Sequence, residues 1–116
     1  MITIRPATYD DLVAIDGMAP PRTCRAQAAV QDGKVVAVWG IYPFNTRFML
    51  FSNLSDEFLA KKRNVVIGIA AVWKLLADRP KLPVLAFADP EIKGSDALVK
   101  HMGFECLSGD LYQWMP

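Results

Sequence analysis

The chain has 116 residues, of which 22% are charged, and its formal net charge is +1. This length fits a single domain over residues 1–116 with a hydrophobic core of its own. The balance of charge excludes a protein that coats nucleic acid, which would carry a clear basic excess. The basic run at residues 61–63 is explained more simply as a solvated helix face. A hydrophobic content of 53% predicts a dense core or an apolar surface that meets a partner.

Membrane and metal sites are not expected from the sequence. No apolar run reaches the roughly 18 residues that a membrane helix needs. The first residues lack the long apolar region of a signal peptide, so we expect a cytoplasmic protein. Cys24 and Cys106 are far apart and belong to no metal-binding spacing, and the chain has a single histidine. The sequence therefore predicts no metal ion.

The first predicted elements are a strand and a short helix. Residues 2–5 alternate between apolar and polar side chains, as in a half-buried strand. Thr8 is a good N-cap for the helix that follows. Asp10 and Asp11 lie in its first turn, where the helix dipole favours acidic side chains. Pro20 is expected to end this helix.

Three strands are predicted next. The dipeptide Asp32-Gly33 predicts a hairpin turn between the first two strands. The second strand is nearly all apolar, which is typical of a central strand covered on both faces. The three strands are expected at residues 25–31, 35–42 and 47–51.

The longest periodic segment lies in the middle of the chain. Ser55 is a good N-cap, and apolar residues at helical spacing continue to about Asp78, before Pro80. Residues 65–73 are apolar without a break except at Gly68. This pattern is typical of a helix that is buried on more than one side.

The last third of the chain is predicted to contain three strands and one helix. Ser95 is expected to cap the helix and Gly103 to end it. The order of elements is β-α-β-β-β-α-β-α-β-β, which predicts an α+β (mixed α/β) domain with helices packed on a mixed sheet. The last three strands are expected at residues 84–88, 104–107 and 111–114.

Three stretches of the sequence resemble the GCN5-related N-acetyltransferases, the GNAT superfamily. They are the opening strand and helix start at residues 2–12, the hairpin at residues 32–37, and the helix that ends in Gly-Phe at residues 97–105. The resemblance covers the chain from end to end. It implies a GNAT-like, mostly antiparallel central sheet of six to seven strands with about three helices.

The resemblance also implies where acetyl-CoA would bind. The family's motif is Arg/Gln-x-x-Gly-x-Gly/Ala at the start of the long helix, where backbone N–H groups hold the pyrophosphate. Its nearest match here implies Arg63, Asn64 and Gly68 as cofactor-binding residues. The first glycine position is taken by Val66, whose branched side chain would obstruct a close approach of the phosphates.

The start of the long helix decides whether this motif can work. If the helix begins at Ser55, Arg63 lies two turns inside it, where N–H groups are already bonded. Asp56 and Glu57 would then occupy the true N-terminus and repel a pyrophosphate. If the chain is instead irregular until Arg63, the motif is nearly in place. The sequence favours the start at Ser55 and leaves the other open.

The family's usual catalytic residues are not found in the sequence. A glutamate on the fourth strand often takes the proton of the acceptor amine, and a tyrosine on the last helix often acts as the acid. Residues 47–52 contain no carboxylate, and Val99 stands at the tyrosine position. His101 is more simply a helix-surface residue. The sequence therefore assigns no catalytic residue, and surviving catalysis is expected between the fourth and fifth strands.

A narrower resemblance concerns residues 36–43, which read Val-Ala-Val-Trp-Gly-Ile-Tyr-Pro. They resemble small acetyltransferase-like proteins of tailed phages. The resemblance implies a phage- or prophage-derived binding or virion assembly protein with reduced or no catalysis, in the host cytoplasm or the virion. Its apolar surface would meet a second copy or a protein partner. The alternative is an acetyl-CoA-dependent N-acetyltransferase acting on an amine of a small molecule or protein.

Overall fold

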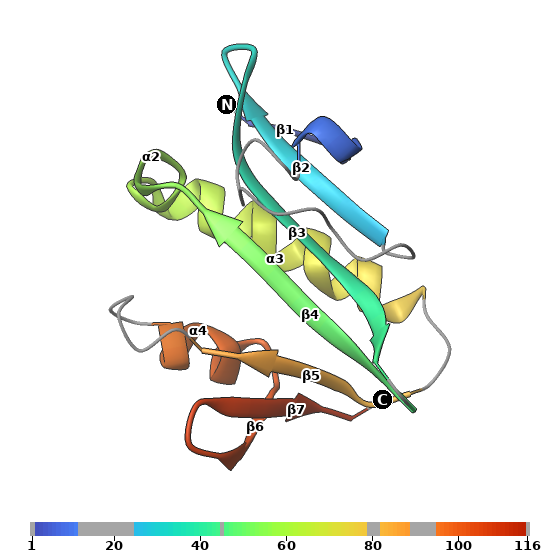
Figure 1. Ribbon diagram of the computed structural model, residues 1–116. Helices are drawn as coiled ribbons and strands as arrows, with labels where there is room; N and C mark the ends of the chain where they lie inside the picture. Colours follow the sequence, from blue (N-terminus) through green and yellow to red (C-terminus); the bar gives the residue numbers. More distant parts are fainter. Residues whose placement is uncertain (1, 12–24, 45, 79–81, 89–94, 116) are drawn as a thin grey trace.

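The computed structural model describes residues 2–11, 25–44, 46–78, 82–88 and 95–115. They form one sheet of seven strands in the order β1-β2-β3-β4-β5-β7-β6. The strands are β1 (Thr3–Pro6), β2 (Arg25–Gln31), β3 (Lys34–Phe44), β4 (Arg47–Leu54), β5 (Val84–Phe87), β6 (Glu105–Ser108) and β7 (Leu111–Trp114). The helices are α2 (Asp56–Leu59), α3 (Lys62–Ala77) and α4 (Ser95–His101), and residues 9–11 form a further helical turn (Figure 1).

The predicted fold class is confirmed. The pair β4–β5 is parallel, and the other five strand pairs of the described sheet are antiparallel. Asp32 and Gly33 have φ of 53° and 79°, so both adopt the left-handed conformation that a two-residue hairpin turn needs. β3 lies between β2 and β4, and its residues 36–41 are buried. The hairpin and the central strand therefore form as predicted.

Close packing of the central strands depends on Gly40. A Cβ atom at this position would clash with the carbonyl oxygen of Arg25 and would lie 2.8 Å from the ring of Phe51. The first contact involves backbone that cannot move aside, and the second would require the ring to move. Glycine at this position lets the ring of Phe51 lie across β3.

α3 and α4 cover the same face of the sheet (Figure 1). The indole N–H of Trp73 donates a hydrogen bond to the carbonyl of Met102 at 3.0 Å and so ties α3 to the residue that directly follows α4. Val66 is 65% exposed and Trp73 is 45% exposed. The prediction that the long helix is buried on more than one side is therefore wrong. The core beneath the helices includes Val36, Trp39, Ile41, Val72, Leu75, Leu76, Val84, Val99 and Met102.

The predicted single helix over residues 55–78 is also wrong. The chain forms the one-turn helix α2, and Lys61 is extended (φ −117°, ψ 120°) before α3 begins. The side-chain amide of Asn64 donates to the carbonyl of Phe58 at 3.3 Å. In a continuous helix that carbonyl would accept from the N–H of Lys62. Asn64 therefore takes the place of the helical bond and separates the two helices.

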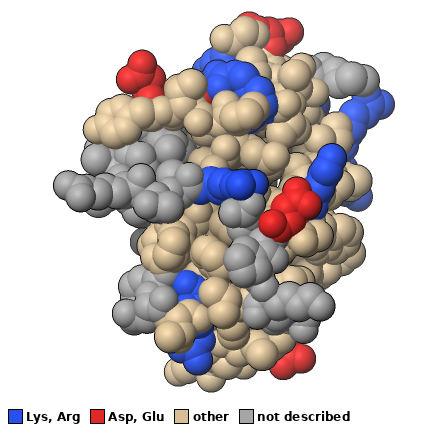
Figure 2. Space-filling view, turned by 90° about the vertical axis from the view of Figure 1, so that its right-hand side faces the viewer, with Lys and Arg blue, Asp and Glu red and all other residues tan. Residues whose placement is uncertain are grey.

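Charged side chains are interspersed on the surface shown in Figure 2. Basic and acidic groups lie among uncharged residues on this face. In the described part of the chain, no helix is long and apolar enough to cross a membrane. No group of three His, Cys, Asp or Glu residues among those described is placed to hold a metal ion.

Candidate functional site

α3 begins without a side-chain cap. Lys61, its N-cap residue, makes no side-chain hydrogen bond to the first turn. The N–H of Asn64 donates to the carbonyl of Lys61 at 3.0 Å, and this is the first hydrogen bond of the helix. The N–H groups of Lys62 and Arg63 precede it and have no acceptor within the helix. Together with the positive end of the helix dipole, these two N–H groups form an arrangement suited to an anion.

The side chains at this helix start are basic. Residues 61–63 are all exposed, and the first turn of α3 contains no acidic residue. Asp56 and Glu57 belong to the separate turn α2, and the Glu57 carboxylate lies 3.5 Å from Nζ of Lys34. The sequence interprets the run at residues 61–63 as a solvated helix face. In the structure Lys62 and Arg63 are exposed in the first turn of α3, and the extended Lys61 directly precedes that turn.

β4 and β5 diverge on the side where α3 begins. Their parallel register covers three residue pairs and ends at Leu50 and Ala86. Beyond Leu50, β4 continues to Leu54 and pairs with β3 along its other edge, whereas β5 ends at Phe87. In Figure 1 the two arrowheads point apart, and α2 lies beside the end of β4. The open helix start and the divergence of the strands therefore lie at the same end of the sheet.

The chain is similar to known proteins in its structure. No protein-family model matches the chain, and no curated protein matches it. The Escherichia coli protein YhhK, named an N-acetyl transferase and solved bound to coenzyme A, superposes with a TM-score of 0.67 at 16% identity, covering 100% of this chain and 99% of that one. The chain has the GNAT fold.

Two further structures show the same GNAT fold. A GNAT family acetyltransferase from Elizabethkingia anophelis, with acetyl-CoA bound, gives a TM-score of 0.66 at 13% identity and covers 99% of this chain and 98% of that one. An N-acetyltransferase from Staphylococcus aureus Mu50 gives 0.69 at 11% identity, covering 99% and 97%. At these identities the likeness concerns the fold.

The structure places the three predicted cofactor-binding residues in different surroundings. Arg63 is exposed at the start of α3. Asn64 is only 2% exposed, and its side-chain amide donates to Phe58 and, at 3.5 Å, to Oε1 of Gln31. Gly68 is buried, and a Cβ there would lie 3.1 Å from the ring of Phe58. Asn64 and Gly68 thus have packing roles, and their contact with acetyl-CoA stays a prediction.

Val66 stands at the first glycine position of the GNAT motif. It lies in the second turn of α3, one turn behind the two N–H groups that open the helix. A phosphate held by those groups would approach along the helix axis and would not need to contact the Val66 backbone. The open helix start therefore lies closer to Lys61 than the motif implies, and Asn64, directly before the apolar run at residues 65–73, is the polar residue in the sequence that marks this position.

The two strands that diverge supply no general base. β4 and β5 carry no carboxylate. Val99 is buried on the core side of α4, and His101 is exposed with its ring centroid 6.4 Å from that of Trp73. Neither β4 nor β5, as the structure describes them, contains a residue that could take the role of the glutamate in the GNAT pattern.

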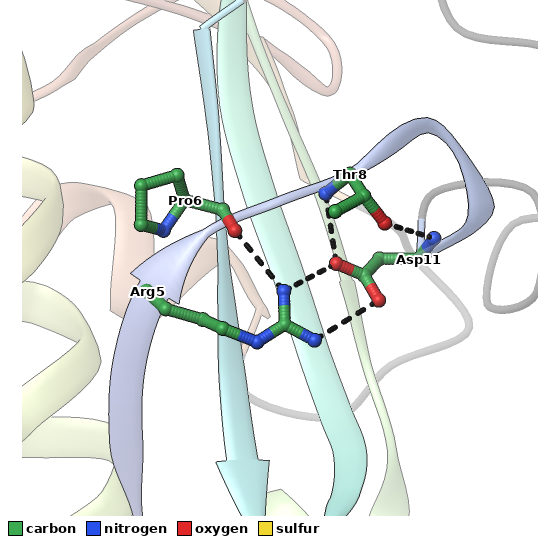
Figure 3. Close-up of polar contacts among 4 residues, drawn as sticks. All are labelled: Arg5, Pro6, Thr8 and Asp11. Atoms are coloured by element: carbon green, nitrogen blue, oxygen red, sulfur yellow. Dashed lines mark hydrogen bonds and ion pairs between the residues drawn. The ribbon is translucent and has the colours of Figure 1, made fainter.

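One carboxylate held by several hydrogen bonds lies elsewhere, at the first helical turn (Figure 3). The Arg5 guanidinium donates to both carboxylate oxygens of Asp11, at 2.6 and 3.1 Å. The Thr8 N–H donates to the same carboxylate at 2.8 Å, and the Asp11 N–H donates to the Thr8 hydroxyl at 3.2 Å. The hydrogen bonds from Arg5 hold the pKa of the Asp11 carboxyl well below its usual range. This carboxylate is a capping group and is unsuited to serve as a base.

Proposed function

We propose that the chain binds CoA and its acyl thioesters at the first turn of α3 and transfers the acyl group to an amine. The observation that carries this proposal is the break at Lys61. It leaves an uncapped, basic helix start beyond the end of β4, where β4 and β5 diverge. Two of the GNAT structures that superpose on the chain contain CoA or acetyl-CoA.

The residues present fit the phosphates of CoA. The N–H groups of Lys62 and Arg63 can donate to a pyrophosphate, and the helix dipole favours its negative charge. The side chains of residues 61–63 are exposed and can form charge-assisted hydrogen bonds to the phosphate oxygens. The edge of β4 that faces β5 up to Leu50 is not paired with β5 from Phe51 onward. The acyl end of the ligand would lie toward this edge.

The reaction requires a neutral amine. The nitrogen lone pair attacks the thioester carbonyl carbon, a C–N bond forms, and the C–S bond breaks. The sulfur leaves as a thiolate and takes up the proton released by the amine. The described strands β4 and β5 hold no carboxylate to remove a proton beforehand. The part of these two strands in this step is therefore to bind and orient the two substrates.

Titration calorimetry with acetyl-CoA and with CoA tests the phosphate site. We expect micromolar binding, and Arg63→Ala should weaken it at least tenfold, about 1.4 kcal/mol. Lys74→Ala is the matched control, because Lys74 is an exposed basic residue in the last turn of the same helix. Its affinity should stay within about twofold of the wild type. Absence of binding at millimolar ligand, or equal losses in both variants, would overturn the proposal.

A second candidate function is binding or virion assembly without catalysis, in a phage-derived protein. Two observations favour it. Val99 is buried at the position of the GNAT tyrosine, and α3 carries an exposed apolar stripe formed by Val66, Ala70, Trp73 and Ala77. We propose that this stripe would meet a second copy or a protein partner. Light scattering of the purified protein tests it, with Val66→Lys expected to convert an oligomer to monomers. A monomeric wild type that acetylates amines would exclude this candidate.

A further inference from the structure

Two aromatic side chains lie where β4 and β5 separate. Leu50 and Ala86 are the last paired residues of these strands, and Phe51 and Phe87 are the residues that follow them. Ala86 belongs to the core beneath α3, so strand alternation turns Phe87 to the opposite face of the sheet. Phe51 lies on that same opposite face, because it packs in the small cluster around Val38.

The two rings differ in how firmly they are held. The ring of Phe51 lies across Gly40 of β3, and its centroid is 6.1 Å from that of Tyr42. It is half-buried and fixed by these contacts. Phe87 is 66% exposed, which makes it the most exposed large apolar side chain among the described residues. A large aromatic ring left in solvent at the end of a strand is a feature that a bound ligand would explain.

On β3, β4 and β5, the side chains that lie next to the two rings on this face are uncharged. By strand alternation, the residues of β3, β4 and β5 on this face carry no carboxylate to pair with an ammonium group. The register places Glu105 of β6 on the same face, in the row of Leu85 and two strands away from β5. On the three strands that carry or adjoin the rings, a polycationic amine would find no counter-charge. The residues that form this part of the face are Val38, Gly40 and Tyr42 of β3, Met49, Phe51 and Asn53 of β4, and Leu85 and Phe87 of β5.

We infer that the acceptor is an arylamine, with its nitrogen bonded directly to an aromatic ring that packs against Phe51 and Phe87. The inference rests on the proposed acyl transfer and names its acceptor. Such a nitrogen is unprotonated at neutral pH, since its lone pair is delocalised into the ring. It therefore needs no base to remove a proton before the attack. An acceptor of this kind is consistent with β4 and β5, which contain no carboxylate.

The chemical step is balanced without any further group. The arylamine nitrogen attacks the carbonyl carbon of acetyl-CoA, the C–N bond forms, and the C–S bond to CoA breaks. One N–H proton passes to the departing thiolate, so that the products are the N-acetyl arylamine and CoA with a free thiol. The role of Phe51 and Phe87 is to hold the ring, and neither residue exchanges a proton.

A panel of four amines tests the inference with the full chain and acetyl-CoA. The amines are 4-methylaniline, 4-methylbenzylamine, cyclohexylamine and spermidine, and the products are CoA thiol and the N-acetyl amine, measured by mass spectrometry. We expect kcat/KM to be highest for 4-methylaniline, by about tenfold over 4-methylbenzylamine. A preference for spermidine or cyclohexylamine would overturn the arylamine assignment.

Variants at the exposed ring separate this inference from the proposed function. Phe87→Ala should lower kcat/KM for 4-methylaniline about tenfold, the scale of one lost apolar contact in a pocket, and Phe87→Leu should recover part of the loss. Leu107→Ala is the control, because Leu107 is an exposed apolar residue of β6. Unchanged kcat/KM in Phe87→Ala would refute the acceptor site.

The affinity for acetyl-CoA is measured on the same proteins. We expect it to stay within about twofold in Phe87→Ala, since the ring lies apart from the start of α3. If the wild type binds acetyl-CoA but prefers another amine, the acceptor assignment alone fails. If the wild type does not bind acetyl-CoA at all, the proposed function fails and the arylamine assignment with it. Thermal unfolding of each variant shows whether the fold is kept, as expected at exposed positions.

Discussion

The starts of α2 and α3 lie close together in the chain and are built in opposite ways. At α2 the Ser55 hydroxyl accepts a hydrogen bond from the N–H of Phe58 at 3.2 Å, and two acidic residues occupy the first turn. At α3 no side chain caps the helix, and basic residues surround its first turn. The first helix end is satisfied by its own chain. The second is left open to an external anion, which is why we place the ligand there.

Asn64 is the residue on which this difference depends. Its side chain closes α2 by binding the Phe58 carbonyl, and its backbone N–H opens α3 by binding the Lys61 carbonyl. It also reaches Gln31, which anchors the junction to β2. A buried amide with these partners fixes where one helix ends and the next begins.

The largest effect is expected from Asn64→Ala. The substitution leaves the Phe58 carbonyl buried without its partner, at a cost of about 2 kcal/mol in the free energy of unfolding. Urea denaturation followed by circular dichroism measures this loss. The neighbouring Arg63→Ala is the control, because Arg63 is exposed and its loss should change stability by less than about 0.5 kcal/mol. Equal stability of the two variants would remove Asn64 from its proposed role.

Removing the cap of α2 should have a smaller effect on stability and none on the ligand. Ser55→Ala is expected to cost about 1 kcal/mol in the free energy of unfolding, because the Phe58 N–H loses its acceptor. Ser52→Ala, an exposed position on β4, serves as the control. The affinity for CoA should stay unchanged in both variants. A tenfold weaker affinity in Ser55→Ala would show that the two helix starts are not independent.

Adding a cap to α3 should raise stability and weaken the binding of CoA. Lys61→Asp places an acceptor at the N-cap, and we expect a gain of about 0.5 kcal/mol in stability. The new carboxylate would compete with phosphate for the same N–H groups and repel it, so the affinity for CoA should fall. Calorimetry and urea denaturation on one sample measure both changes. If the affinity for CoA rose, the ligand could not bind at this turn.

Local patterns in the sequence predict most of this fold. The hairpin at Asp32 and Gly33, the cap at Ser55 and the bounds of β2 and β7 depend on residues adjacent in the chain, and all four match the structure. The break in the long helix does not match, because Asn64 forms it through the Phe58 carbonyl and a further contact with Gln31 of β2, and helical periodicity contains neither contact.

The surroundings of Gly68 and the proximity of Phe51 to Phe87 also depend on contacts that no local pattern contains. Gly68 matches a glycine of the GNAT motif, yet its surroundings are set by the ring of Phe58, which belongs to another helix. The proximity of Phe51 and Phe87 follows from the β4–β5 register, and no local pattern contains that register. Contacts that join distant segments decide the site, whereas neighbouring residues decide the elements.

The helical turn at residues 9–11 offers a third helix start and the smallest expected effect. Asp11 caps it, and its carboxyl has a lowered pKa in the folded chain because of the hydrogen bonds from Arg5 and Thr8. In the unfolded chain the pKa is about 3.9. As the pH falls below about 4, the unfolded chain takes up the proton first, so this contribution to stability is lost toward lower pH.

Thermal unfolding between pH 7 and pH 3 measures the dependence. We expect Asp11→Asn to be less stable than the wild type at pH 7 and to approach it at pH 3, because the substitution removes the carboxylate that the folded chain favours. Asp10→Asn is the matched control, since Asp10 is exposed in the same turn and makes no capping bond to Thr8. Parallel pH profiles in the wild type and Asp11→Asn would mean that Arg5 contributes nothing to this helix start. The turn at residues 9–11 would then resemble the start of α3 in gaining nothing from a side-chain cap. The lack of a cap would no longer distinguish α3 as the place where a ligand binds.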